Sequence, residues 1–208
     1  MSTLKATNLS HASAASPNIV LDSAGKVTFG GAVAGAGMDL ITPTSVAGTG
    51  VTVSGGAVSF TAASTASANG VFTATYNNYL LVYSFTSTSN ANIYFRLRAS
   101  GTDSAASYLG MCRGYTYSTG AAATIDYGST GVFVLISQGA NAKIGGSLTI
   151  ISPFIAESTT AFGLAARDAL FSSTGGIQTA ATAYDGLTLL PSAGTMTGNL
   201  RVYGLKNS

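Results

Sequence analysis

Few residues in this sequence are of the types that perform catalysis, and the sequence keeps them apart. His11 is the only histidine and lies near the start of the chain, ahead of the strand-like segments. A serine–histidine or cysteine–histidine pair within those segments is therefore excluded, and so is a histidine-containing zinc site. Cys112 is the only cysteine, which excludes an intrachain disulfide, and its apolar neighbours indicate a buried thiol.

The acidic residues are the remaining candidates for catalysis. Two carboxylates brought together by the fold could hydrolyse a glycosidic bond. A turn residue is the simpler interpretation of each, because Asp126 precedes Tyr127 and a glycine, and Asp185 precedes Gly186. We therefore predict no enzymatic activity, no catalytic or metal-ligating residue and no bound cofactor. The seven acids are Asp22, Asp39, Asp103, Asp126, Glu157, Asp168 and Asp185.

Two other groups of side chains could bind a partner. Arg96 and Arg98 alternate along one strand-like segment, so both point to the same side and can pair with an acid on a neighbouring strand. Structural ion pairs are the favoured interpretation, and a partner surface is the alternative. Tyr115, Tyr117 and Tyr127 lie near Gly- and Ser-rich loops, and exposed tyrosines stack on sugar rings. They are candidate receptor contacts, with core packing as the alternative.

Charged residues make up only 8% of the chain, against roughly 25% in an ordinary soluble protein. Small residues and hydroxyls take their place, which favours a surface covered by other copies of the chain or by a larger assembly. The formal charge of +2 is not gathered in a basic block, so nucleic-acid binding is not expected. No apolar run reaches the roughly 18 residues of a membrane span and no signal peptide is visible, so we predict synthesis in a cytoplasm and no membrane insertion.

The clearest strands lie in the middle of the chain, within residues 71–103. Apolar residues on both faces of 79–85 predict a strand buried between two layers. Strict alternation over 93–98 predicts an antiparallel strand with one dry face and one wet face. The polar segment 86–91 connects the two strands.

The rest of the body shows the same pattern of short strands and Gly, Ser, Asn and Asp turns. Segments 51–54 and 57–60 flank Gly55-Gly56 and predict a hairpin in which Val53 faces Val58. Further strands are expected at 108–117, 132–137, 143–151 with a kink or bulge at Gly145-Gly146, 177–183, 186–190 and 197–205. Segment 162–171 could be a short helix or a strand. Roughly ten strands predict an all-β fold, an antiparallel β-sandwich of jelly-roll-like type.

The N-terminal part has a different composition from the body. Residues 1–16 are polar and indicate an arm, and 18–22 with 26–29 predict a hairpin around an Asp- and Gly-containing turn. The glycine-rich run GGAVAGAG at 30–37 lacks the lysine and the following helix of a phosphate loop. It indicates a linker, with close packing of three or more backbones around an axis as the alternative. We therefore predict an N-terminal arm and attachment segment at 1–37 and a β-sandwich domain at 38–208.

Several stretches resemble proteins of the virion surface of tailed bacteriophages, cyanophages in particular. PNIVLDSAGKVTFGG at 17–31 resembles the attachment leaders of tail fibres, and FRLRASGTD at 95–103 and RVYGLKN at 201–207 are similar to a β-domain of fibre, minor tail and capsid-surface proteins. The resemblance implies a homotrimeric virion structural protein on the virion surface. Its N-terminal arm would bind other virion proteins, and its sandwich would face outward. A short tail fibre that attaches to a host surface glycan is the leading expectation, and a capsid decoration or head-fibre protein is the alternative.

Overall fold

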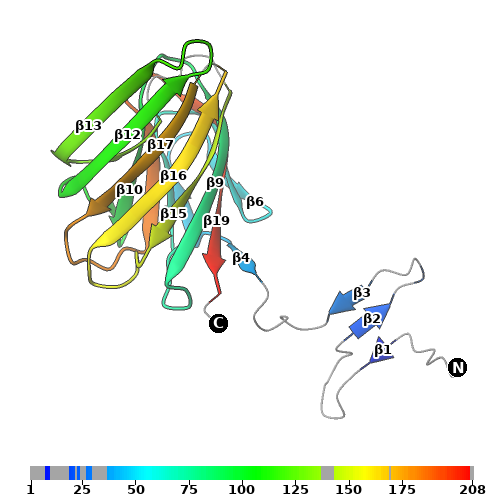
Figure 1. Cartoon of the computed structure of the whole chain (residues 1–208). Helices are drawn as coiled ribbons and strands as arrows, with labels where there is room; N and C mark the ends of the chain where they lie inside the picture. Colours follow the sequence, from blue (N-terminus) through cyan, green and yellow to red (C-terminus); the bar gives the residue numbers. More distant parts are fainter. Residues whose placement is uncertain are drawn as a thin grey trace, which may run out of the picture. The chain divides into compact units, whose positions relative to one another are not determined.

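The computed structural model of the chain is drawn in Figure 1, and it describes residues 37–136, 143–168 and 170–206, without the side chains of 123–130. Before residue 37 it describes residues 8–9, 19–21, 23 and 27–29. The chain divides into two compact units, Met1–Ala36 with Ser208, and Gly37–Asn207. Each unit has β-sheet of its own.

The N-terminal unit contains a three-stranded antiparallel sheet of β1 (Asn8–Leu9), β2 (Ile19–Leu21) and β3 (Val27–Phe29), in that order. The hairpin predicted from the sequence is confirmed, because Ile19 pairs with Phe29 and Leu21 with Val27. The pairing of β1 with β2 was not predicted. The rest of the predicted arm at 1–16 and the glycine-rich residues 30–36 lie outside the described residues.

The body consists of two antiparallel sheets, and the predicted all-β antiparallel sandwich is confirmed. The small sheet has the order β11-β10-β18-β8-β5, with β14 also paired to β10. Its strands are β5 (Ser45–Ala47), β8 (Ala66–Asn69), β10 (Ile93–Ala99), β11 (Thr102–Asp103), β14 (Phe133–Ile136) and β18 (Gly186–Pro191). The jelly-roll ordering stays a prediction.

The large sheet has the order β13-β12-β17-β16-β15-β9-β19-β7-β6, with β4 also paired to β19. In Figure 1 this sheet lies in front and β10 of the small sheet lies behind it. Its strands are β4 (Met38–Ile41), β6 (Val51–Ser54), β7 (Ala57–Ala63), β9 (Asn78–Ser87), β12 (Tyr108–Thr116), β13 (Ala122–Thr130), β15 (Lys143–Ile151), β16 (Thr159–Arg167), β17 (Leu170–Gln178) and β19 (Met196–Leu205).

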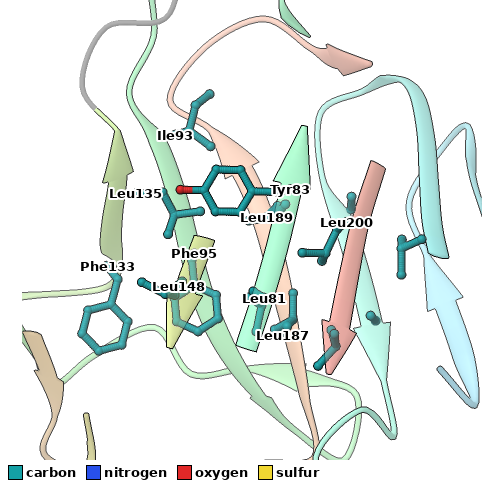
Figure 2. Close-up of a cluster of buried hydrophobic side chains, with 14 of the residues drawn as sticks. Leu81, Tyr83, Ile93, Phe95, Phe133, Leu135, Leu148, Leu187, Leu189 and Leu200 are labelled. Atoms are coloured by element: carbon teal, nitrogen blue, oxygen red, sulfur yellow. The ribbon is translucent and has the colours of Figure 1, made fainter. Parts of the chain in front are cut away.

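The hydrophobic core lies between the two sheets (Figure 2). Leu81 and Leu148 of the large sheet meet Phe95 and Leu189 of the small sheet, and all four are almost completely buried. Strand β14 adds Phe133, whose ring stacks on that of Phe95 with the ring centroids 5.5 Å apart. Burial of this apolar surface is the main force that holds the two layers together.

The prediction that segment 79–85 is buried on both faces was wrong. In β9, Tyr79, Leu81 and Tyr83 are buried, whereas Val82 on the opposite face is 39% exposed. No described element covers that opposite face, so the domain has two layers and not three. The apolar residues on both faces of β9 reflect a core on one side and an exposed apolar surface on the other.

The prediction for segment 93–98 was correct on one face and wrong on the other. Ile93, Phe95 and Leu97 of β10 are fully buried, as expected for the dry face. The other face is not wet, because Arg98 is only 9% exposed. Strands β9 and β10 belong to different sheets, so the polar segment between them crosses from one layer to the other.

The hairpin of β6 and β7 has the predicted register, with Val51 opposite Phe60 and Val53 opposite Val58. Its turn residues Gly55 and Gly56 have φ angles of 56° and 77°. Residues other than glycine rarely adopt positive φ angles at two consecutive positions. This turn therefore requires glycine or a residue such as asparagine.

Segment 162–171, for which the sequence allowed a helix or a strand, contains strands. Strands β16 and β17 pair antiparallel from Arg167 opposite Leu170 to Thr159 opposite Gln178. Of the expected kink or bulge at Gly145-Gly146, the bulge is excluded, because β15 keeps one register with both β9 and β16 through these residues.

The described residues form nineteen strands, so the expected ten were too few. Strand β13 was missed because its Ala-, Thr- and Gly-rich sequence reads as a loop. The described residues contain no helix with the length and apolarity that crossing a membrane requires.

Candidate functional site

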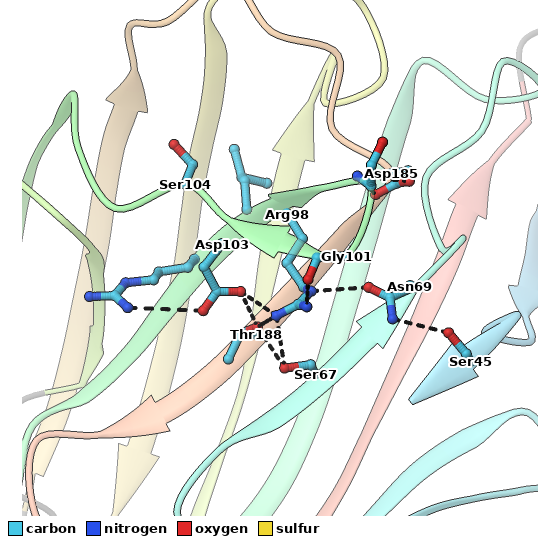
Figure 3. Close-up of polar contacts among 12 residues, drawn as sticks. Ser45, Ser67, Asn69, Arg98, Gly101, Asp103, Ser104, Asp185 and Thr188 are labelled. Atoms are coloured by element: carbon cyan, nitrogen blue, oxygen red, sulfur yellow. Dashed lines mark hydrogen bonds and ion pairs between the residues drawn. The ribbon is translucent and has the colours of Figure 1, made fainter. Parts of the chain in front are cut away.

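The outer face of the small sheet carries a buried polar network centred on Arg98 (Figure 3). The Arg98 guanidinium donates to Asp103 Oδ1, to Thr188 Oγ1 at 2.9 Å and to Ser67 Oγ at 3.1 Å. Its remaining donors reach the Gly101 carbonyl and Asn69 Oδ1, the latter at 3.0 Å. A buried cation is tolerated only when its charge and its donors are matched in this way.

Arg96 uses the same carboxylate more loosely. Its Nη1 lies 3.9 Å from Asp103 Oδ2, and its Nε donates to the Gly131 carbonyl at 2.9 Å. Thr188 of β18 also donates to Asp103 Oδ1, at 2.7 Å, and Ser67 and Asn69 belong to β8, so the network joins the four strands β8, β10, β11 and β18. Both arginines are therefore engaged within the domain, and the network has the character of a structural clamp rather than of a free binding surface.

Tyr117 is the more exposed of the two candidate receptor tyrosines whose side chains the structure describes. It is 61% exposed and lies in the turn between β12 and β13. Backbone hydrogen bonds hold this turn, with Gly120 N donating to Thr116 O at 2.8 Å and Thr116 N donating to Ala121 O at 3.1 Å. Gly120 has a φ of 63°, which suits glycine. The aromatic ring is thus presented to solvent by an ordered turn.

The other two tyrosines are placed differently. Tyr115 is 41% exposed, but it lies on β12 opposite Phe171 of β17 and not in a loop. Tyr127 lies on β13 opposite Gly110, and its side chain is outside the described part of the structure. The three candidates therefore do not form one loop cluster.

Tyr108, at the start of β12, belongs to the core. It is fully buried, accepts a hydrogen bond from Leu97 N at 2.9 Å and donates to Ser104 O at 3.1 Å. Burial raises the pKa of Tyr108 to about 12, although the hydrogen bond from Leu97 N and an interaction with the Ser104 side chain lower it. Its ring makes an edge contact with Phe133, with the centroids 4.8 Å apart.

A second charged cluster ties the end of β19 to β4. Tyr76 Oη donates to Asp39 Oδ2 at 2.6 Å, and Lys206 Nζ lies 3.2 Å from Asp39 Oδ1. The hydrogen bond from Tyr76 lowers the pKa of Asp39, and Lys206 lowers it further, while the same hydrogen bond raises the pKa of Tyr76. Both shifts favour the ionised carboxylate and the neutral phenol, so this contact is a stable link and not a poised acid–base pair.

The other described carboxylates also lack the arrangement of a catalytic pair. Asp185 accepts hydrogen bonds from Ser100 N at 3.2 Å, and Glu157 and Asp168 are exposed in connections between strands. Within the described ranges no group of three or more His, Cys, Asp or Glu side chains could hold a metal ion. Asp22, His11 and the side chain of Asp126 lie outside the described residues.

An apolar surface on the large sheet was missed by the sequence interpretation. We call it the apolar outer face: the side chains of β9, β15, β16, β17 and β12 that point away from the small sheet. Six of the eleven large apolar side chains that the described residues expose lie on it, namely Val82, Leu109, Met111, Tyr115, Phe162 and Leu164. The signal that was missed is the size of the side chains on the two faces of β16. The small residues Ala161 and Ala165 point inward, and the large residues Phe162 and Leu164 point outward.

The inward positions are small because β14 packs directly on these strands. A Cβ atom at Gly176 would lie 2.5 Å from the Leu109 carbonyl oxygen and 2.8 Å from Phe133 Cε1, so both the backbone of β12 and the Phe133 ring require glycine here. The large residues of these strands are therefore displaced to the outer side.

No model of a known protein family matches the chain, and no curated protein matches it significantly.

Proposed function

We propose that this chain is a structural protein of a tailed-bacteriophage virion, a short homotrimeric tail fibre on the virion surface. In this proposal the N-terminal segment binds other virion proteins, and the sandwich contacts the host cell, with a surface glycan as the receptor class. The protein has no enzymatic activity in this role, needs no cofactor and binds no nucleic acid. The resemblance of segments 17–31, 95–103 and 201–207 to phage surface proteins motivates the choice of virion.

The observation that carries the proposal is the use of the described charged groups. Arg98 pairs with Asp103, and Lys206 pairs with Asp39, so these charges link strands within the domain. What remains exposed is poor in charge and rich in apolar and hydroxyl side chains. Such a surface is suited to packing and adhesion, whereas acid–base catalysis needs free titratable groups beside a substrate.

Competition for adsorption tests the proposal. Purified full-length chain, added to host cells before the virions, is expected to occupy the receptor and to lower the fraction of virions adsorbed in a dose-dependent way. The same amount of thermally unfolded chain is the control. Undiminished adsorption at saturating chain would argue against a role in attachment.

Antibody labelling of intact virions separates the proposal from its alternative. Label at the tail supports the fibre. Label distributed over the capsid would replace it with a capsid decoration or head-fibre protein, and virions without label would reject both.

A further inference from the structure

The apolar outer face has a ridge with a trough on each side. On β16, Phe162 and Leu164 are 52% and 51% exposed and form the ridge. Thr149 and Gly175 flank Phe162 on the neighbouring strands, and Ser147 and Ser173 flank Leu164. Because the flanking residues are small, the ridge stands above them on both sides.

Two hollows lie along the ridge, and each is lined by residues of both neighbouring strands, β15 and β17. The larger, of about 450 Å³, is lined by Ser147, Thr149, Phe162, Gly163, Leu164, Ser173 and Thr174. The smaller, of about 230 Å³, shares Ser147 and Leu164 with it and extends to Phe171. The two hollows are therefore parts of one continuous relief around the ridge.

The residues that line the two hollows indicate which kind of partner can bind there. Neither hollow is lined by an amide, a carboxylate or a guanidinium group, which are the groups that bind sugars and charged peptides with directional hydrogen bonds. The outward-pointing charges among the described residues of β9, β15, β16, β17 and β12 are Lys143, which begins β15, and Arg113, which lies on β12 two strands from β16. A partner with an uncharged, largely apolar surface therefore fits the ridge and hollows of the apolar outer face best.

The size of the face matches an interface between proteins. Five strands spaced about 4.8 Å apart and about nine residues long at ~3.3 Å each give a face of roughly 700 Å². A standard protein–protein interface buries about 800 Å² on each partner. Contiguous apolar patches of several hundred Å² on a soluble domain mark interaction sites.

We infer that the apolar outer face is the surface on which a second copy of this chain docks. A second copy supplies what the face lacks: large apolar side chains that fill the troughs, and no charge to be desolvated at the centre. This inference rests on the proposed homotrimer, and it names the surface through which its subunits meet. It also separates the tyrosines, because Tyr115 belongs to the subunit interface while Tyr117 at the hairpin tip is left free for a receptor.

The test compares the solution mass of three full-length chains at micromolar concentration. Wild type is expected to assemble, and Phe162→Lys is expected to be a folded monomer, with at least a tenfold weaker association. Ile155→Lys is the matched control, because Ile155 is 43% exposed but lies in the connection between β15 and β16. It is expected to assemble as wild type does. Circular dichroism verifies that each variant keeps its β structure.

Each outcome decides a different question. A Phe162→Lys chain that assembles as wild type does would overturn the interface while leaving the homotrimer intact. A monomeric wild type would reject the homotrimer and the interface with it, whereas the attachment role is judged separately by adsorption. If Phe162→Lys does not fold, Ser147→Arg places the charge in the trough instead. A folded monomer then supports the inference, and an assembled Ser147→Arg chain overturns it.

Discussion

Arg98 and Asp103 stand directly opposite each other on β10 and β11, and their side chains pair across this short strand contact. Only 11% of the Arg98 side chain and 24% of the Asp103 side chain are exposed. The same carboxylate accepts a hydrogen bond from Thr188 of β18. Asp103 therefore links β11, which follows the turn after β10, to both β10 and β18 of the small sheet.

Replacing Asp103 by Asn is expected to lower the free energy of unfolding by about 2 to 4 kcal/mol, because it leaves a buried guanidinium without its counter-charge. Urea unfolding followed by circular dichroism measures this. Glu157→Gln is the matched control, since Glu157 is exposed and its change should stay within about 0.5 kcal/mol. Equal stability of the two variants would show that the network is too solvated to matter.

Gly163 is expected to be irreplaceable for a steric reason. A Cβ atom there would lie 2.1 Å from the Ser147 carbonyl oxygen and 2.8 Å from Leu148 Cα, both of them backbone atoms of the neighbouring strand. Gly163→Ala is therefore expected to cost about 2 kcal/mol or more, since β15 and β16 must separate locally. Thermal unfolding of the variant measures the loss.

Gly145→Ala is the matched control for Gly163→Ala. The nearest atom to a Cβ at Gly145 is the Tyr83 carbonyl oxygen at 4.0 Å, an ordinary contact. This variant is expected to be neutral or stabilising by up to about 0.5 kcal/mol, because alanine restricts the unfolded chain. A cost at Gly145 equal to that at Gly163 would contradict the steric explanation.

The sequence predicted the fold class because strand signals are local. Alternation in Ile93, Phe95 and Leu97, and the Gly55-Gly56 turn, each depend on a few neighbouring residues, and both were confirmed. Strand β13 was missed because its small residues carry no local hydrophobic pattern. Its place in the sheet comes from pairing with β12, a contact that no single window of sequence displays.

The candidate site was predicted less well, because it depends on which side of a strand is covered. Alternation shows that Phe162 and Leu164 share a face, but not that this face is the outer one. The deciding contact is remote: Phe133 of β14 occupies the inner side beside Gly176 and leaves no room for large residues there.

Stability is expected to fall at high pH, because buried phenols resist ionisation. Burial raises the pKa of Tyr83 and raises that of Tyr108 to about 12, whereas a phenol in the unfolded chain ionises near about 10. The stabilisation by Tyr108 is therefore complete below about pH 10 and is lost as the pH rises from there to about 12. For Tyr108 this amounts to about 2 to 3 kcal/mol.

Urea unfolding at several pH values between about 8 and 11 follows this loss, with Tyr108→Phe as the comparison. That variant is expected to lose about 1 to 2 kcal/mol at neutral pH, because Leu97 N then lacks its acceptor. Above about pH 10 its stability is expected to fall less steeply than that of wild type. Parallel pH profiles of the two chains would contradict the assignment of this dependence to Tyr108.

Tyr117 is the residue on which a receptor-binding role is best tested, because its side chain is 61% exposed on an ordered turn and lies outside the core. Tyr117→Ala is expected to leave the free energy of unfolding within about 0.5 kcal/mol of wild type. If the ring stacks on a sugar of the host surface, binding weakens by ~1 kcal/mol or more per site, and a trimer multiplies the loss through avidity.

Tyr115→Ala distinguishes a receptor contact from an interface contact. Because Tyr115 lies on the apolar outer face, its removal is expected to weaken subunit association first and adsorption only as a consequence. Binding of each chain to host cells, and its mass at micromolar concentration, measure the two effects independently. If Tyr117→Ala changes neither adsorption nor stability, the hairpin tip is not the receptor site, and the capsid-decoration alternative gains support.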